Sequence, residues 1–160
     1  MMKGSSKKAP LLVVLLTLVM LFSLFGAASA QGAQVTKGEF ITYASGPSLG
    51  YEITGSAQLV RAADGKTLAM VQVKGLTPDT TYGVHVHNDT CSNLTSGHYQ
   101  DVPGGAVDAV NEIWPTVTSN ANGNGSGFAM NDFTARPEAQ SIVIHANPTG
   151  GPRIACADLN

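Results

Sequence analysis

Residues 51–73 read YEITGSAQLVRAADGKTLAMVQV and contain two runs in which apolar and polar residues alternate. The runs cover residues 51–60 and 67–73, and Asp64-Gly65 lies between them. Alternation with a period of two is typical of a strand with one buried face. An Asp-Gly pair between two such runs is a strong signal for a tight turn. This stretch therefore predicts an antiparallel β-hairpin.

Further short strand-like runs lie on both sides of the hairpin, and no convincing helical period appears after residue 30. They are bounded by turn-forming residues and cover residues 38–43, 82–87, 116–118, 128–133, 141–145 and 153–157. The Gly-rich tract at 122–127 is interpreted as a hairpin turn, with a flexible linker as the alternative. Seven or eight short strands predict an all-β fold, a Greek-key antiparallel β-sandwich or flattened barrel of about eight strands.

The first thirty residues have the three parts of a secretory signal peptide. Three lysines precede a fifteen-residue apolar run from Leu11 to Phe25, and Ala28-Ser29-Ala30 follows. This order predicts cleavage after Ala30, with an uncleaved membrane anchor as the alternative. The expected organisation is a signal peptide at 1–30 and one domain at 31–160, with no membrane association after cleavage. The expected location is secreted, periplasmic or cell-surface.

The net charge of the chain indicates which classes of binding partner are not expected. The whole chain has nine Lys and Arg against eleven Asp and Glu. Without the three leader lysines, six basic residues face eleven acidic ones, a formal net charge of −5. An acidic domain offers no attraction to nucleic acid or to anionic lipid, so neither is expected as a partner.

The chain has two cysteines, Cys91 and Cys156. In an exported chain they are interpreted first as one disulfide, with free thiols or a cysteine–metal site as alternatives. A zinc site built on thiolates is disfavoured because there is no C-x-x-C pair. A bridge that closes a loop of about 65 residues would stabilise the fold by roughly 4 kcal/mol.

All four histidines occupy positions suited to a metal site. His85 and His87 are two apart on a predicted strand, so both imidazoles project from one face. His98 lies in a stretch without periodicity at 88–111, and His145 ends an apolar strand. Each has an ordinary alternative, since an H-x-H pair can be two half-exposed polar residues and the other two can be loop and strand-end polar groups.

Together with their neighbours these residues resemble the copper/zinc superoxide dismutases. The resemblance runs from about Tyr51 to the C-terminus and depends on a series of motifs in one order: Lys74-Gly75-Leu76-Thr77, Gly83-Val84-His85-Val86-His87, Cys91, Gly97-His98-Tyr99, Ile142-Val143-Ile144-His145 and Pro152-Arg153-Ile154-Ala155-Cys156. In that family a G-x-H-V-H strand, a cysteine, a loop histidine, a strand-end histidine and an R-x-x-C segment follow one another in this way.

The resemblance implies a role for each matching residue. His85, His87 and His145 are expected to bind copper, and His98 corresponds to the histidine that joins copper to zinc. Arg153 corresponds to the arginine that attracts the superoxide anion, and Cys91 with Cys156 corresponds to the intrasubunit disulfide. The implied reaction is dismutation of superoxide to dioxygen and hydrogen peroxide by a one-electron copper cycle, in which His98 also handles a proton. A homodimer is a further expectation.

The chain departs from the family in two respects. No histidine is left for a zinc site, so copper is expected without zinc. The loops are short, with thirteen residues between His98 and Glu112 and seven between His145 and Arg153. This combination resembles a copper-only branch in which a carboxylate holds the bridging histidine. Glu112 is the candidate, with Asp101 and Asp108 as alternatives.

Two other functions stay open at this point. One is a non-catalytic copper-binding protein for storage or delivery outside the cytoplasm, favoured by the short loops and the acidic charge. The other is a metal-free adhesion or scaffold sandwich. Copper binding at stoichiometric levels and the effect of Arg153→Ala on rate would separate the three.

Overall fold

The computed structural model describes residues 32–160. The predicted signal peptide at 1–30 lies outside the described residues. No helix in the described part of the chain is long and apolar enough to span a membrane. The one short helix there, α2, covers Ser45–Ser48.

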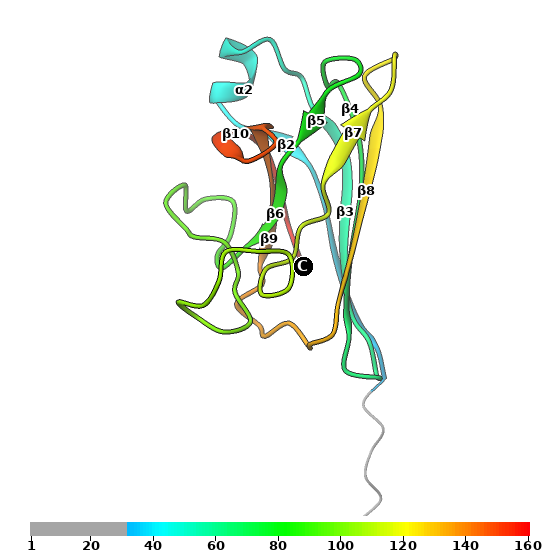
Figure 1. Cartoon of the computed structure of the whole chain (residues 1–160). Helices are drawn as coiled ribbons and strands as arrows, with labels where there is room; N and C mark the ends of the chain where they lie inside the picture. The colour runs from blue at the N-terminus through cyan, green and yellow to red at the C-terminus, as the bar shows by residue number, and fades with distance from the viewer. Residues whose placement is uncertain (1–31) are drawn as a thin grey trace, which may run out of the picture. The chain divides into compact units, whose positions relative to one another are not determined.

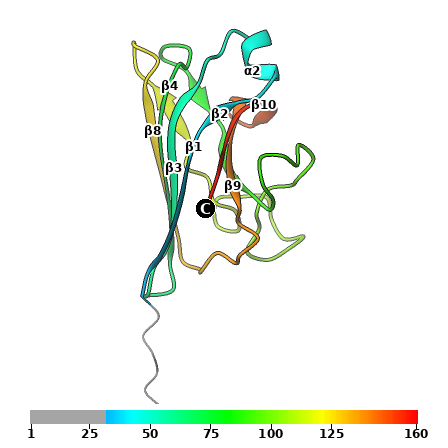
Figure 2. The same cartoon turned by 180° about the vertical axis from the view of Figure 1, so that it is seen from behind.

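Ten strands of residues 32–160 form two antiparallel sheets, which face each other in Figures 1 and 2. The larger sheet has the order β1 (Gln34–Glu39), β3 (Thr54–Arg61), β4 (Thr67–Lys74), β8 (Gly125–Asn131), β7 (Val117–Ser119) and β5 (Thr81–Tyr82). The smaller sheet has the order β2 (Ile41–Thr42), β10 (Gly150–Asp158), β9 (Ser141–Asn147) and β6 (Val84–His87). The predicted all-β sandwich is therefore confirmed.

The hairpin predicted from residues 51–73 is formed by β3 and β4. Their register runs from Thr54 opposite Lys74 to Arg61 opposite Thr67. Gly65 adopts a φ of 87°, a conformation that the turn requires and that residues with a side chain rarely adopt. Strand β4 next pairs with β8, which is not its neighbour in sequence, so the chain crosses to the second sheet and returns, as a Greek key requires.

The core lies between the two sheets and is built from alternate residues of each strand. On β4 every second residue is buried, from Thr67 to Val73. The second sheet contributes the buried side chains of Val84, Val86, Ile142, Ile144 and Ile154. Since Val84 and Val86 point into this core, the residues between and after them on β6 point to the opposite face.

Two predicted strands are broken where the chain passes from one sheet to the other. The prediction of one strand at 82–87 was wrong, because Gly83 separates β5 of the larger sheet from β6 of the smaller one. A Cβ on Gly83 would lie only 2.7 Å from the carbonyl oxygen of Pro148, so a close approach of backbones fixes this crossing point. The run at 38–43 is divided in the same way at the buried Phe40. These breaks account for ten strands where about eight were expected.

Candidate metal centre

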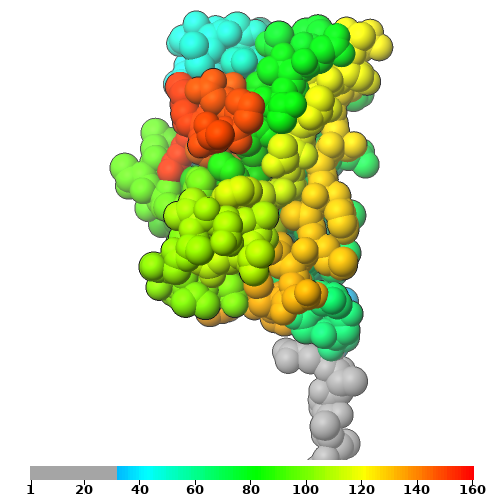
Figure 3. All heavy atoms as spheres, in the orientation of Figure 1, coloured from blue at the N-terminus to red at the C-terminus, as the bar shows by residue number. Residues whose placement is uncertain are grey.

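Three of the four histidines are positioned by adjacent strands of the smaller sheet. His85 and His87 are on the face of β6 opposite to the core, and His145 lies on β9, which pairs with β6. His98 belongs to the long loop at 88–116 and bridges back to His87. In the space-filling view this green to yellow-green loop lies beside the orange-red turn between β9 and β10 (Figure 3).

The four imidazoles converge on one point. One nitrogen from each of His85, His87, His98 and His145 lies within 4.8 Å of the corresponding atom of every other. The ring centroids of His85 and His98 are 4.0 Å apart, and those of His98 and His145 are 5.8 Å apart. The prediction that the four histidines form one cluster is confirmed.

The outward-facing nitrogens of three rings are held by hydrogen-bond acceptors. Nδ1 of His87 lies 3.1 Å from the carbonyl oxygen of Ser96, and Nδ1 of His145 lies 3.0 Å from that of Gly151. Nδ1 of His98 lies 2.7 Å from Oε2 of Glu112. Because a carbonyl oxygen can only accept, Nδ1 of His87 and of His145 carries the proton and Nε2 has a free lone pair.

His85 differs from the other three histidines. Its Nδ1 is buried and has no hydrogen-bond partner among the described residues. A buried polar atom without a partner is uncommon and points to a functional role, such as binding an ion. The lone pair of His85 Nδ1 would complete a set of four nitrogen donors. Such a set fits the coordination of a metal ion.

Burial makes His85, His87 and His145 poor bases and suits them to bind a metal ion. Desolvation lowers the pKa of His85 and of His87 to about 3, and neighbouring imidazoles add to the effect. The pKa of His145 is also lowered, mainly by burial. The three rings are therefore neutral at pH 7, and metals bind neutral imidazole. Imidazole is a ligand for zinc, copper, iron and nickel, so the donor set fits a transition-metal ion.

Glu112 contacts Nδ1 of His98, on the side of the ring away from the other three histidines. Only 1% of the surface of Glu112 is exposed. Trp114 Nε1 also donates to Oε2 at 2.8 Å, and Gln100 Nε2 donates to Oε1 at 3.0 Å. The two alternative carboxylates lie elsewhere. Asp101 is 3.8 Å from the Arg136 guanidinium, and Asp108 Oδ1 accepts backbone N–H groups of the loop. Of the three candidates, the structure places Glu112 against His98.

Arg153 lies opposite His145 in the pairing of β10 with β9. Its guanidinium donates to the carbonyl oxygen of Ser96 and, at 3.4 Å, to that of Asn93. The Ser96 carbonyl oxygen thus accepts hydrogen bonds from both Arg153 and His87. The positive charge of Arg153 contributes to lowering the pKa of His87 and of His145, after burial.

The predicted disulfide between Cys91 and Cys156 is confirmed. It joins the beginning of the loop at 88–116 to the buried part of β10. Two hydrogen bonds hold the same point: Tyr43 donates its hydroxyl to the carbonyl of Cys91, and the Cys91 N–H donates to Asp158. The loop that provides His98 is therefore fixed to the sheet that provides His145.

Four contributors to the site were not predicted. Gln100 and Trp114 each stand two residues from a predicted site residue, His98 and Glu112, and in extended chain such a spacing places side chains on one side. That spacing could have identified both. The backbone carbonyls of Ser96 and Gly151 could not have been identified, because any residue type supplies a carbonyl.

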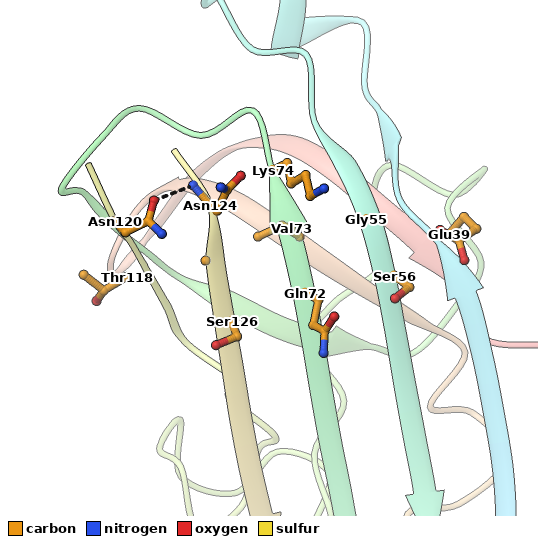
Figure 4. Close-up of a pocket in the computed structure, with 11 residues that line it drawn as sticks. Glu39, Gly55, Ser56, Gln72, Val73, Lys74, Thr118, Asn120, Asn124 and Ser126 are labelled. Atoms are coloured by element: carbon orange, nitrogen blue, oxygen red, sulfur yellow. Dashed lines mark hydrogen bonds between the residues drawn. The ribbon is translucent and has the colours of Figure 1, made fainter. Parts of the chain in front are cut away.

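A groove of about 640 Å³ lies on the outer face of the larger sheet, away from the histidines. Figure 4 shows its polar side chains, with Ser56, Gln72, Lys74 and Ser126 on neighbouring strands and Asn120 and Asn124 in the turn between β7 and β8. None of its lining residues is a histidine or a cysteine.

Comparison with known proteins supports the fold. No family model matches the chain, and no curated protein matches it. Solved structures do match, among them one described as a crystal structure analysis of the clock protein EA4. That protein is 18% identical, with a TM-score of 0.58 over 79% of this chain and 93% of the other. A likeness at this identity shows the fold alone.

Proposed function

We propose that this chain is an exported superoxide dismutase that uses copper, related to the copper/zinc superoxide dismutases and similar to their copper-only branch. The observation that carries the proposal is the convergence of four imidazoles, three of them neutral through burial, beside the Arg153 guanidinium. The motif order noted in the sequence supports the same family.

His85, His87, His98 and His145 would hold the copper ion. When bound, copper supplies the one-electron exchange by which one superoxide loses an electron to give dioxygen, while a second gains an electron and two protons to give hydrogen peroxide. Zinc has no part in the proposal, because Nδ1 of His98 faces Glu112 and the chain has no further histidine.

Arg153 would attract the substrate anion. Its guanidinium is permanently charged and lies close enough to the cluster to influence two of the imidazoles. In a domain with a net charge of −5, such a local positive charge counteracts the overall repulsion of superoxide.

His98 would be the residue that exchanges a proton. Its side chain is 27% exposed, whereas His85, His87 and His145 are all buried. A proton taken up at Nε2 of His98 could therefore come from water, while Nδ1 stays hydrogen-bonded to Glu112.

The test compares purified protein loaded with one equivalent of copper against free copper at the same concentration. We expect dismutase activity well above the free-copper control. We expect Arg153→Ala to lower the rate about ten-fold or more while copper affinity stays unchanged. A copper-loaded protein without activity above the control would overturn the proposal.

A second candidate function is non-catalytic copper storage or delivery outside the cytoplasm. The hydrogen bonds of Arg153 favour this function. The guanidinium already donates to the carbonyls of Ser96 and Asn93, so fewer of its N–H groups are free to bind a substrate anion. Stoichiometric copper binding without turnover, and with no effect of Arg153→Ala on any rate, would support this function.

A further inference from the structure

The carboxylate of Glu112 is buried and accepts hydrogen bonds from three neighbouring side chains. In residues 32–160 no lysine or arginine forms an ion pair with it. Its three side-chain donors are His98, Trp114 and Gln100. A buried charge without a cation depends on such donors, since each unmade hydrogen bond leaves part of the cost of desolvation uncompensated.

The three donors are divided unequally between the two carboxylate oxygens. Oε2 accepts from His98 Nδ1 at 2.7 Å and from Trp114 Nε1 at 2.8 Å, whereas Oε1 accepts from Gln100. An indole N–H can only donate, so the Trp114 contact requires Oε2 to act as an acceptor. An accepting Oε2 in turn favours the tautomer of His98 with its proton on Nδ1 and a free lone pair on Nε2.

Trp114 also contacts the other side of the cluster. Its ring centroid lies 5.5 Å from that of His85, the histidine whose Nδ1 has no partner among the described residues. One side chain therefore both holds the carboxylate behind His98 and packs beside His85.

The amide of Gln100 links Glu112 to the backbone of the loop. Its oxygen accepts the N–H of Gly104 at 2.9 Å, which leaves the amide nitrogen to face Oε1 of Glu112. Gln100 thus ties the carboxylate to the loop at 100–104 but makes no contact with the oxygen that holds His98.

We infer that Trp114 is a positioning residue of the metal centre, which fixes the ring orientation and tautomer of His98 through Oε2 of Glu112. The inference depends on the metal site of the proposed function but not on turnover. Without the indole N–H, Oε2 would lose one of its two donors, and both the carboxylate and the His98 ring would be less constrained.

The test uses Trp114→Phe, which keeps an aromatic ring and removes the N–H. Nitrogen NMR of the metal-free protein reports the tautomer of each histidine, and we expect one Nδ1–H form of His98 in the wild type and a mixture in the variant. Competition with a chelator should show copper affinity about ten-fold weaker, and the Cu(II) EPR parameters should change. Tyr99→Phe is the control, because it removes a buried hydroxyl that accepts from Arg136 without touching Glu112.

An unchanged His98 tautomer together with unchanged EPR parameters in Trp114→Phe would overturn the inference, and so would an equal effect of Tyr99→Phe.

The wild type provides a second measurement should the variant fail to fold. Trp114 is the only tryptophan of the chain, so its indole N–H is a single resonance. We expect that proton to exchange with water at least about ten-fold more slowly than free indole, and exchange at the free rate would also overturn the inference. None of these readouts depends on dismutase activity, so the two proposals can fail separately.

Discussion

His87 and His145 direct their Nε2 atoms at each other across 3.4 Å, and each carries its own proton on the opposite ring nitrogen. Two lone pairs that face each other in a buried site repel. The carbonyls of Ser96 and Gly151 prevent either ring from relieving this by moving its proton to Nε2. Such an arrangement is unfavourable by itself and becomes favourable when a cation lies between the nitrogens, as at a metal centre.

The first prediction follows from this geometry. Because copper would bind the folded protein only, a free copper concentration about 1,000 times the Kd should stabilise the wild type by about 4 kcal/mol. His145→Ala removes one of the two opposed nitrogens, and we expect the stabilisation to fall below about 1 kcal/mol. Calorimetric unfolding with and without copper measures both. Gln72→Ala, an exposed residue of the larger sheet, should behave like the wild type. A full copper effect in His145→Ala would contradict the prediction.

The second prediction concerns the carboxylate behind His98. In Glu112→Gln a neutral amide replaces the charged acceptor and brings N–H donors of its own. Loss of such a partner of a metal ligand typically lowers affinity, so we expect copper binding about 10- to 100-fold weaker by chelator competition. Asp101→Asn removes a carboxylate from the same loop that faces Arg136 instead of His98. It should change affinity by less than about two-fold, and equal effects of the two substitutions would refute this role of Glu112.

The third prediction concerns the disulfide. Replacing Cys91 and Cys156 with serine together should lower the free energy of unfolding by about 4 kcal/mol, since the bridge closes a loop of 65 residues. The loop at 88–116 would also lose its covalent link to β10. This loop provides His98 and the Ser96 carbonyl that holds His87, so copper affinity should fall as well. Urea denaturation of the metal-free protein measures the first effect. A loss below about 1 kcal/mol would show that Tyr43 and Asp158 hold the loop without the bridge.

The site could be predicted from the sequence where side-chain identity and strand period decide it. His85 and His87 share a face because they are two apart on a strand, and Val84 and Val86 indicate which face is the core. The same reasoning holds for the β3–β4 hairpin, where Asp64-Gly65 stands between two alternating runs.

What escaped prediction depends on tertiary contacts. The switch of sheets at Gly83 arises from close approach to the backbone at 147–148, and nothing in the local alternation indicates it. The Ser96 carbonyl serves both His87 and Arg153, yet any residue at 96 could offer it. A half-exposed H-x-H pair was the ordinary alternative, but both rings are buried. They pack against His98 of the loop at 88–116 and against His145 of β9, which are far away in sequence.

The last prediction is the pH dependence of stability in the metal-free protein. The pKa of His85 and of His87 is about 3 in the folded chain, against an ordinary value of 6.5, and that of His145 is lowered too. Between these values the unfolded chain binds protons that the folded chain excludes, so stability present above pH 6.5 is lost as the pH falls toward 3. The slope is up to about 1.4 kcal/mol per pH unit for each histidine. Denaturant unfolding between pH 6.5 and 5 measures it, since most carboxylates are still ionised there. His85→Asn with His87→Asn removes two of the titrating groups and should flatten the dependence, whereas an equally steep loss in this double variant would contradict the assignment.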